Sequence, residues 1–131
     1  MNNTDLINRK ESDLPLCFEE WGWTYHHMGI PTQEKMPGER YIPHLGMYVT
    51  GFDTSPYGVE WMRFDEDSIV DKLIQHVPHL AFVVNDLKEA LVGKELIGEP
   101  SIPSEGIKVA MILHNGAPIE LMEFETRVVK G

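Results

Sequence analysis

Two short stretches of the sequence repeat one pattern in which a glutamate stands at the same place. "VEWMRF" at residues 59–64 and "IELMEF" at residues 119–124 both place a methionine and a phenylalanine after that glutamate. Alternation along a strand puts each glutamate on the face that carries these two apolar side chains. A lone carboxylate is costly to bury in such surroundings, so Glu60 and Glu120 each require a partner.

A histidine precedes each of these glutamates on an earlier strand-like segment. "HHMGIP" aligns with "PHLAFV", which places His27 against His79. Two imidazoles and two carboxylates can hold a divalent cation, because their total charge of about −2 balances it. The residue types and their order therefore predict one metal site, with a histidine and a glutamate from each half of the chain: His27, Glu60, His79 and Glu120.

The other histidines fit this site less well. His26 competes with His27, but a regular strand points it to the opposite face, so we prefer His27. His44 and His114 stand beside turn residues, and His76 stands near the end of a predicted helix, where a cation suits the helix dipole. We expect His44 and His114 to be exposed, and none of the three histidines to bind a metal.

The elements that must position these residues follow from caps, turns and hydrophobic periodicity. The sequence predicts, in chain order, a strand that ends at Pro31, a hairpin over 44–64, a helix over 67–77, a strand over 79–84, a helix over 87–92 and a hairpin around Asn115 and Gly116. Pro37 and Gly38 leave room for a helical turn at most in the first connector. The two halves thus share one order of elements, and only the second has a helix between its first strand and its hairpin.

In this order of elements the sequence resembles the vicinal-oxygen-chelate superfamily, which includes glyoxalases, extradiol dioxygenases, methylmalonyl-CoA epimerase and bleomycin-resistance proteins. "HHMGIP", "VEWMRF", "PHLAFVVNDL" and "NGAPIELMEF" match the first and last strands of the family's two modules. The resemblance implies an α+β fold of two βαβββ-like modules, at about 20–65 and 77–126, that form a metal-binding cleft. The first module is expected to have a shortened or missing helix. Residues 1–19 would be an N-terminal arm, and residues 20–131 a single glyoxalase-like domain.

The resemblance also implies a function. It implies a metal-dependent lyase or isomerase of the glyoxalase type, which acts on a small substrate with vicinal oxygens through an enediolate-type intermediate. The metal would be Zn, Ni, Mn or Fe, and either Glu60 or Glu120 would serve as the catalytic base. Two alternatives share the fold: an Fe(II)-dependent ring-cleaving dioxygenase, and a non-catalytic protein that binds a small molecule such as an antibiotic.

Several side chains near these strands allow more than one interpretation. Arg40 and Arg63 could bind a substrate carboxylate or be surface charges. In a regular strand, three aromatic residues would share the face of His27, either as ordinary packing or as part of the pocket wall: Trp21, Trp23 and Tyr25.

Composition narrows the classes of partner. The chain of 131 residues has 21 acidic and 11 basic residues and a formal net charge of −10, which argues against binding to nucleic acid or to an anionic membrane. Its one cysteine, Cys17, allows no intrachain disulfide, and residues 1–14 have no apolar stretch typical of a secretion signal. We therefore expect a cytoplasmic protein. The resemblance implies a small-molecule substrate, and we expect a two-fold homodimer because family members commonly pair their modules and two-fold dimers are the commonest oligomers.

Overall fold

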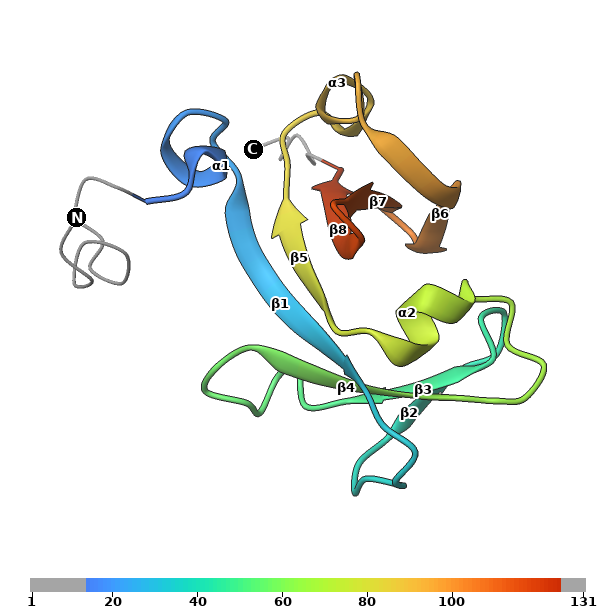
Figure 1. Cartoon of the computed structure of the whole chain (residues 1–131). Coiled ribbons are helices and arrows are strands. Elements are labelled where there is room, and N and C mark those ends of the chain that lie inside the picture. Colours follow the sequence, from blue (N-terminus) through green and yellow to red (C-terminus); the bar gives the residue numbers. More distant parts are fainter. Residues whose placement is uncertain (1–13, 126–131) are drawn as a thin grey trace, which may run out of the picture.

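The computed structural model describes residues 14–125, which form one curled mixed sheet of eight strands and three short helices (Figure 1). The strands are β1 (Thr24–Pro31), β2 (Arg40–Ile42), β3 (Met47–Thr50), β4 (Val59–Phe64), β5 (His79–Val83), β6 (Glu95–Ser104), β7 (Ile107–His114) and β8 (Ala117–Phe124). The helices are α1 (Leu16–Glu19), α2 (Lys72–His76) and α3 (Leu87–Ala90). The strand order is β2-β3-β4-β1-β5-β8-β7-β6.

The two halves of the sheet have the same pairing pattern. β1 pairs with β4 in parallel, with Gly29 opposite Glu60, and β5 pairs with β8 in parallel, with Ala81 opposite Glu120. The remaining neighbours within each half are antiparallel. The predicted α+β fold of two related modules is confirmed, and so is the absence of a helix between the first strand and the hairpin of the first module.

The central pair, β1 and β5, runs antiparallel and joins the modules edge to edge (Figure 1). Its register places His27 opposite Ala81 and Gly29 opposite His79. A pseudo-two-fold axis therefore passes between the two strands, and each histidine lies beside the small residue that follows the other histidine by two positions.

The outer face of the second module is covered by α1 and α3. Phe82, Ile112 and the fully buried Leu121 form the centre of this core, and Cys17 and Phe18 of α1 pack against it. Part of the segment 1–19, which we expected to be an arm, is thus a short helix on the core. Residues 1–13 of that segment lie outside the described part of the chain.

On the inner face, α2 lies within the curl of the sheet and contacts both modules (Figure 1). Its buried residue Ile74 packs with Met62 of β4, and Met111 of β7 packs against the same cluster. This helix is shorter than the predicted helix over 67–77 because Ser68 donates a hydrogen bond to the Leu45 carbonyl instead of capping the helix. Asp71 is the N-cap residue and accepts from the Leu73 N–H.

The second module's helix, α3, has the predicted cap. Asp86 accepts a hydrogen bond from the Glu89 N–H, and the helix ends two residues before the predicted residue 92. Glu123 of β8 accepts a hydrogen bond from the Leu87 N–H and so also caps this helix. Within the described residues, none of the helices is long and apolar enough to cross a membrane.

Leu121→Ala tests the assignment of the outer core. Leu121 is fully buried, so its loss should lower the free energy of unfolding by about 2–5 kcal/mol. Leu80→Ala is the matched control on the neighbouring strand, because Leu80 is 41% exposed and its loss should cost less than about 1 kcal/mol. Urea denaturation measures both values, and equal losses for the two variants would contradict this assignment.

Candidate metal centre

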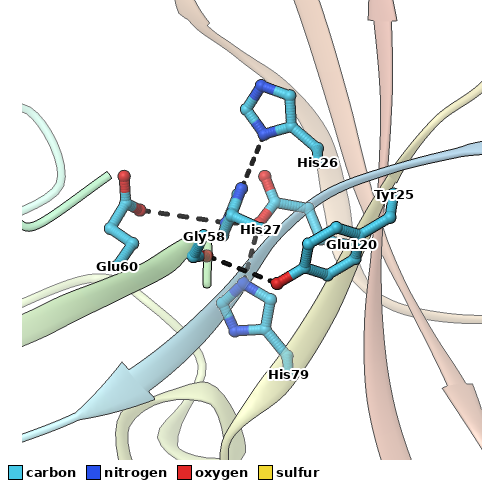
Figure 2. Close-up of polar contacts among 7 residues, drawn as sticks. All are labelled: Tyr25, His26, His27, Gly58, Glu60, His79 and Glu120. Atoms are coloured by element: carbon cyan, nitrogen blue, oxygen red, sulfur yellow. Dashed lines mark hydrogen bonds and ion pairs between the residues drawn. The ribbon is translucent and has the colours of Figure 1, made fainter. Parts of the chain in front are cut away.

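Three of the four predicted ligands lie close together on the inner face of the sheet. His27 comes from β1, His79 from β5 and Glu120 from β8, and their ligating atoms lie within 4.8 Å of one another (Figure 2). The Nε2 atoms of His27 and His79 lie 3.4 Å and 2.8 Å from the same carboxylate oxygen, Oε1 of Glu120. Both histidines are buried.

Glu60 stands beside this group rather than within it. Its Oε1 lies 3.9 Å from Nε2 of His27, the same ring atom that Glu120 approaches (Figure 2). The structure thus brings all four predicted residues to one place, with Glu60 as the outer member. Within residues 14–125, neither Glu60 nor Glu120 forms an ion pair with a lysine or arginine.

The donor set suits a divalent cation. Two imidazole nitrogens and one carboxylate oxygen converge from three adjacent strands, and this combination is used for Zn²⁺ and for Fe²⁺. The second carboxylate, Glu60, adds negative charge next to the group. His27, His79 and Glu120 therefore could hold a metal ion.

The two carboxyl groups have pKa values that differ in direction. Burial raises the pKa of Glu60 above its ordinary value, and the charge of His27 only partly offsets this. Burial would also raise the pKa of Glu120, but hydrogen bonds from His27 and His79 outweigh it and lower the pKa of Glu120 to about 2. Burial lowers the pKa of His27, yet Glu120 and Glu60 together hold it above its ordinary value. The site thus separates a strongly ionised carboxylate from a more basic one.

Gly29 decides where the ring of His79 can lie. A Cβ atom at position 29 would lie 2.7 Å from Nε2 and 2.8 Å from Nδ1 of His79, closer than side chains approach one another. The Nδ1 of His79 is buried and has no hydrogen-bond partner among the described residues. Packing on Gly29, together with the bond to Glu120, therefore orients this ring.

His27 is oriented in a different way, because a β-bulge interrupts β1. Tyr25 pairs with Phe82 and His27 pairs with Ala81, so His26 is an extra residue with no partner on β5. The prediction that His26 points away from His27 is wrong for this reason. Its Nδ1 lies 2.7 Å from Nδ1 of His27 (Figure 2).

The same bulge corrects the predicted aromatic stripe. Because the register shifts between Tyr25 and His27, Tyr25 shares the outer face with its partner Phe82 and not the face of His27. Trp23 also packs against Phe82, with ring centroids 5.8 Å apart. The hydroxyl of Tyr25 donates to the Tyr57 carbonyl. These aromatic residues are packing on the outer face and do not line the candidate metal centre.

Other predicted residues lie away from the centre. His44 and His114 are exposed, as predicted, and so is His76. Arg63 forms a two-pronged ion pair with Glu39, at 2.8 and 2.9 Å, which removes it as a free cation for substrate. Arg40 is exposed on β2. Its register partner on β3, Val49, lies on the same face of the sheet as Glu60 of β4.

A hollow lies on the face of the sheet opposite the candidate metal centre. It has a volume of about 720 Å³ between α1 and β7, and its walls include Trp23, Phe82 and Ile112. None of the four predicted ligands lines it. The hollow is therefore separate from the candidate metal centre.

Solved structures share the fold of this chain. A hypothetical protein from Bacillus halodurans C-125 is 20% identical, with a TM-score of 0.60 over 81% of this chain and 97% of that chain. Methylmalonyl-CoA epimerase from Mycobacterium tuberculosis is 22% identical, with a TM-score of 0.54 over 79% of this chain and 89% of that chain. No family model matches the sequence, and no curated protein matches it. At these identities the likeness shows a common fold.

Gly29→Ala tests whether packing orients His79. The added methyl group overlaps the ring, so the hydrogen bond between His79 and Glu120 should be lost and the free energy of unfolding should fall by about 1–3 kcal/mol. Imidazole ¹⁵N spectra of the metal-free protein report the bond. Gly93→Ala is the control, because position 93 has open space and a strained φ of +75° but lies away from the site. An unchanged His79 signal in Gly29→Ala would contradict this role.

The separation of the two carboxyl pKa values is measurable in the metal-free protein. ¹³C-carboxyl NMR should find Glu120 titrating at about 2 and Glu60 above the ordinary glutamate value. A depressed pKa in the folded state means that Glu120 stabilises the fold above its unfolded pKa of about 4.3, and that this contribution is lost as the pH falls toward 2. Similar midpoints for the two groups would refute the difference.

Proposed function

We propose that this protein is a metal-dependent lyase or isomerase that acts on a small substrate with two adjacent oxygen atoms. The observation that carries the proposal is the unequal pair of glutamates around two buried histidines. Glu120 lies among the donor atoms, while Glu60 stands at their edge with a raised pKa. A fold shared with a methylmalonyl-CoA epimerase supports the reaction class.

The three converging side chains would hold the metal. His27 and His79 present their Nε2 atoms, and Glu120 presents a carboxylate whose low pKa keeps it ionised at any physiological pH. When bound, the metal would supply Lewis-acid polarisation of the substrate oxygens. Release of the two hydrogen bonds that Glu120 accepts from the histidines would accompany loading, since the ring nitrogens must lose those protons.

Glu60 is the group that we assign to proton transfer. In its ionised form it removes a proton from the carbon next to the substrate carbonyl, and the electron pair of that C–H bond moves onto the carbonyl oxygen. The neutral Glu60 then returns the proton to the adjacent carbon, while the hydroxyl proton of the substrate passes to the oxygen of the former carbonyl, so atoms and charge balance in an isomerisation. A carboxyl group with a raised pKa is the stronger base for this step, and burial is the cause of the rise.

Aromatic side chains lie beside the site, next to His26. Phe52, in the segment between β3 and β4, and Phe124, at the end of β8, both lie against the ring of His26. On the other side, α2 fills the curl of the sheet. A small substrate would enter between these walls, with the exposed Arg40 on the face of Glu60 as a candidate partner for an anionic group.

One observation favours a second function. Two histidines and one carboxylate on one face are the ligand set of Fe(II) oxygenases, and the group His27, His79 and Glu120 has this composition. A ring-cleaving dioxygenase would use the metal without needing Glu60 as a base. The role of Glu60 therefore distinguishes the two functions.

The test combines metal binding with proton exchange. Elemental analysis of tag-free protein should find one metal ion per chain in the wild type and in His44→Ala, and none in His79→Ala. In D₂O, the loaded wild type should exchange the C–H hydrogens next to the carbonyl of hydroxyacetone, and Glu60→Gln should retain the metal but lose about 10²-fold or more of this exchange.

Two results would overturn the proposal. His79→Ala protein that keeps its metal as tightly as wild type would show that the site is elsewhere. Hydrogen exchange that is unchanged in Glu60→Gln would show that Glu60 is not the catalytic base. Oxygen consumption with catechol by the Fe(II)-loaded protein, without hydrogen exchange, would establish the dioxygenase instead.

A further inference from the structure

His26 is the residue that the bulge in β1 adds to the site. In an unbroken strand its side chain would point to the outer face, where Tyr25 lies instead. The bulge turns it so that Nδ1 of His26 and Nδ1 of His27 are 2.7 Å apart (Figure 2). At this separation one ring nitrogen must donate a hydrogen bond and the other must accept it.

The ring of His26 is fixed by its neighbours. It stacks on Phe52, with centroids 4.7 Å apart and planes 18° apart, and it lies against Phe124 at 5.6 Å. The residue is half-buried between them. The position of its Nδ1 is therefore set by packing from β8 and from the segment before β4, and it can in turn fix the ring of His27.

The direction of the hydrogen bond follows from the other nitrogen of His27. Its Nε2 faces two carboxylates, Glu120 at 3.4 Å and Glu60 at 3.9 Å, which is the side on which a cation would lie. A neutral imidazole that offers the Nε2 lone pair to a metal carries its proton on Nδ1. That proton must then be donated to His26, whose own proton lies on its Nε2.

We propose that His26 is a positioning residue that accepts a hydrogen bond from the Nδ1–H of His27 and thereby directs the Nε2 lone pair of His27 into the metal centre. The direction of that hydrogen bond and the use of the lone pair by a metal rest on the proposed function, whereas the contact between the two ring nitrogens does not. Partners of this kind contribute about 10–100-fold to metal affinity.

The second histidine lacks such a partner among the described residues. Nδ1 of His79 is buried without a hydrogen bond, and its ring is held by contact with Gly29. The two ligands are thus oriented by different means, one by a hydrogen bond and one by packing. A change at position 26 should therefore affect His27 and leave His79 in place.

Two variants separate hydrogen bonding from stacking. His26→Phe keeps an aromatic ring against Phe52 but has no acceptor. His26→Asn removes the ring but places a carbonyl oxygen near the position of Nδ1. Zinc affinity, measured by competition with a chromophoric chelator, should fall about 10–100-fold in His26→Phe and should recover most of that loss in His26→Asn.

Two outcomes of the zinc-affinity measurement would overturn the proposal. Wild-type affinity in His26→Phe would show that the ring only packs. A loss as large in His26→Asn as in His26→Phe would show that stacking, and not the acceptor, is what matters. Circular dichroism and the Gly29-dependent His79 signal establish that each variant is folded.

Imidazole ¹⁵N spectra of the zinc-loaded protein test the direction of the hydrogen bond. In the loaded wild type, the bonded proton should lie on Nδ1 of His27 and be absent from Nδ1 of His26, and His26→Phe should lose this signal. A proton on Nδ1 of His26 in the loaded protein would refute the role of His26 while leaving the proposed function in place. Wild type that binds no zinc would overturn the proposed function, and with it the role of His26.

Discussion

The antiparallel pairing of β1 with β5 is the constraint on which the rest of the site depends. Its register puts His27 opposite Ala81 and Gly29 opposite His79, so each histidine ring lies over a residue with little or no side chain. The parallel pairs on either side then place Glu60 in the row of Gly29 and Glu120 in the row of Ala81, so that each glutamate lies in one of the two adjacent rows that carry the histidines. A shift by one residue would move every one of these side chains to the other face.

The pairing is symmetric, but the chemistry that results is not. Glu120 receives contacts from both histidines, at 2.8 and 3.4 Å, whereas Glu60 is reached by His27 alone, at 3.9 Å. The pKa values of the two carboxyl groups differ for the same reason. Burial raises the pKa of both groups, but only Glu120 receives hydrogen bonds from the histidines that outweigh this effect. Two glutamates at equivalent positions of the two modules thus have different neighbours and different roles.

Much of this arrangement could be predicted from the sequence, because the sequence repeat identifies equivalent positions in the two modules. The repeated stretches indicated that Glu60, Glu120 and the histidines that precede them would meet at one place. The Asn115 hairpin and the Asp86 cap were also recognisable, since their turn and capping chemistry is local. The fold and the approximate location of the site depend on these local and periodic signals.

What the sequence did not reveal depends on contacts between distant segments. The bulge at His26 has no local signature, and it arises where β1 must pair with β5 on one edge and with β4 on the other. The role of Gly29 could have been suspected, because a small residue follows each histidine by two positions. Helix α2 begins later than predicted because Ser68 bonds to Leu45 from another part of the chain.

The measurement that tests the metal centre most directly is X-ray absorption spectroscopy of the zinc-loaded protein at the zinc edge. One zinc per chain should show two imidazole nitrogens and one carboxylate oxygen at about 2.0–2.2 Å, and Glu120→Gln should remove the oxygen of the carboxylate. A zinc ion with fewer than two imidazole ligands, or a spectrum that Glu120→Gln leaves unchanged, would contradict a metal centre formed by His27, His79 and Glu120.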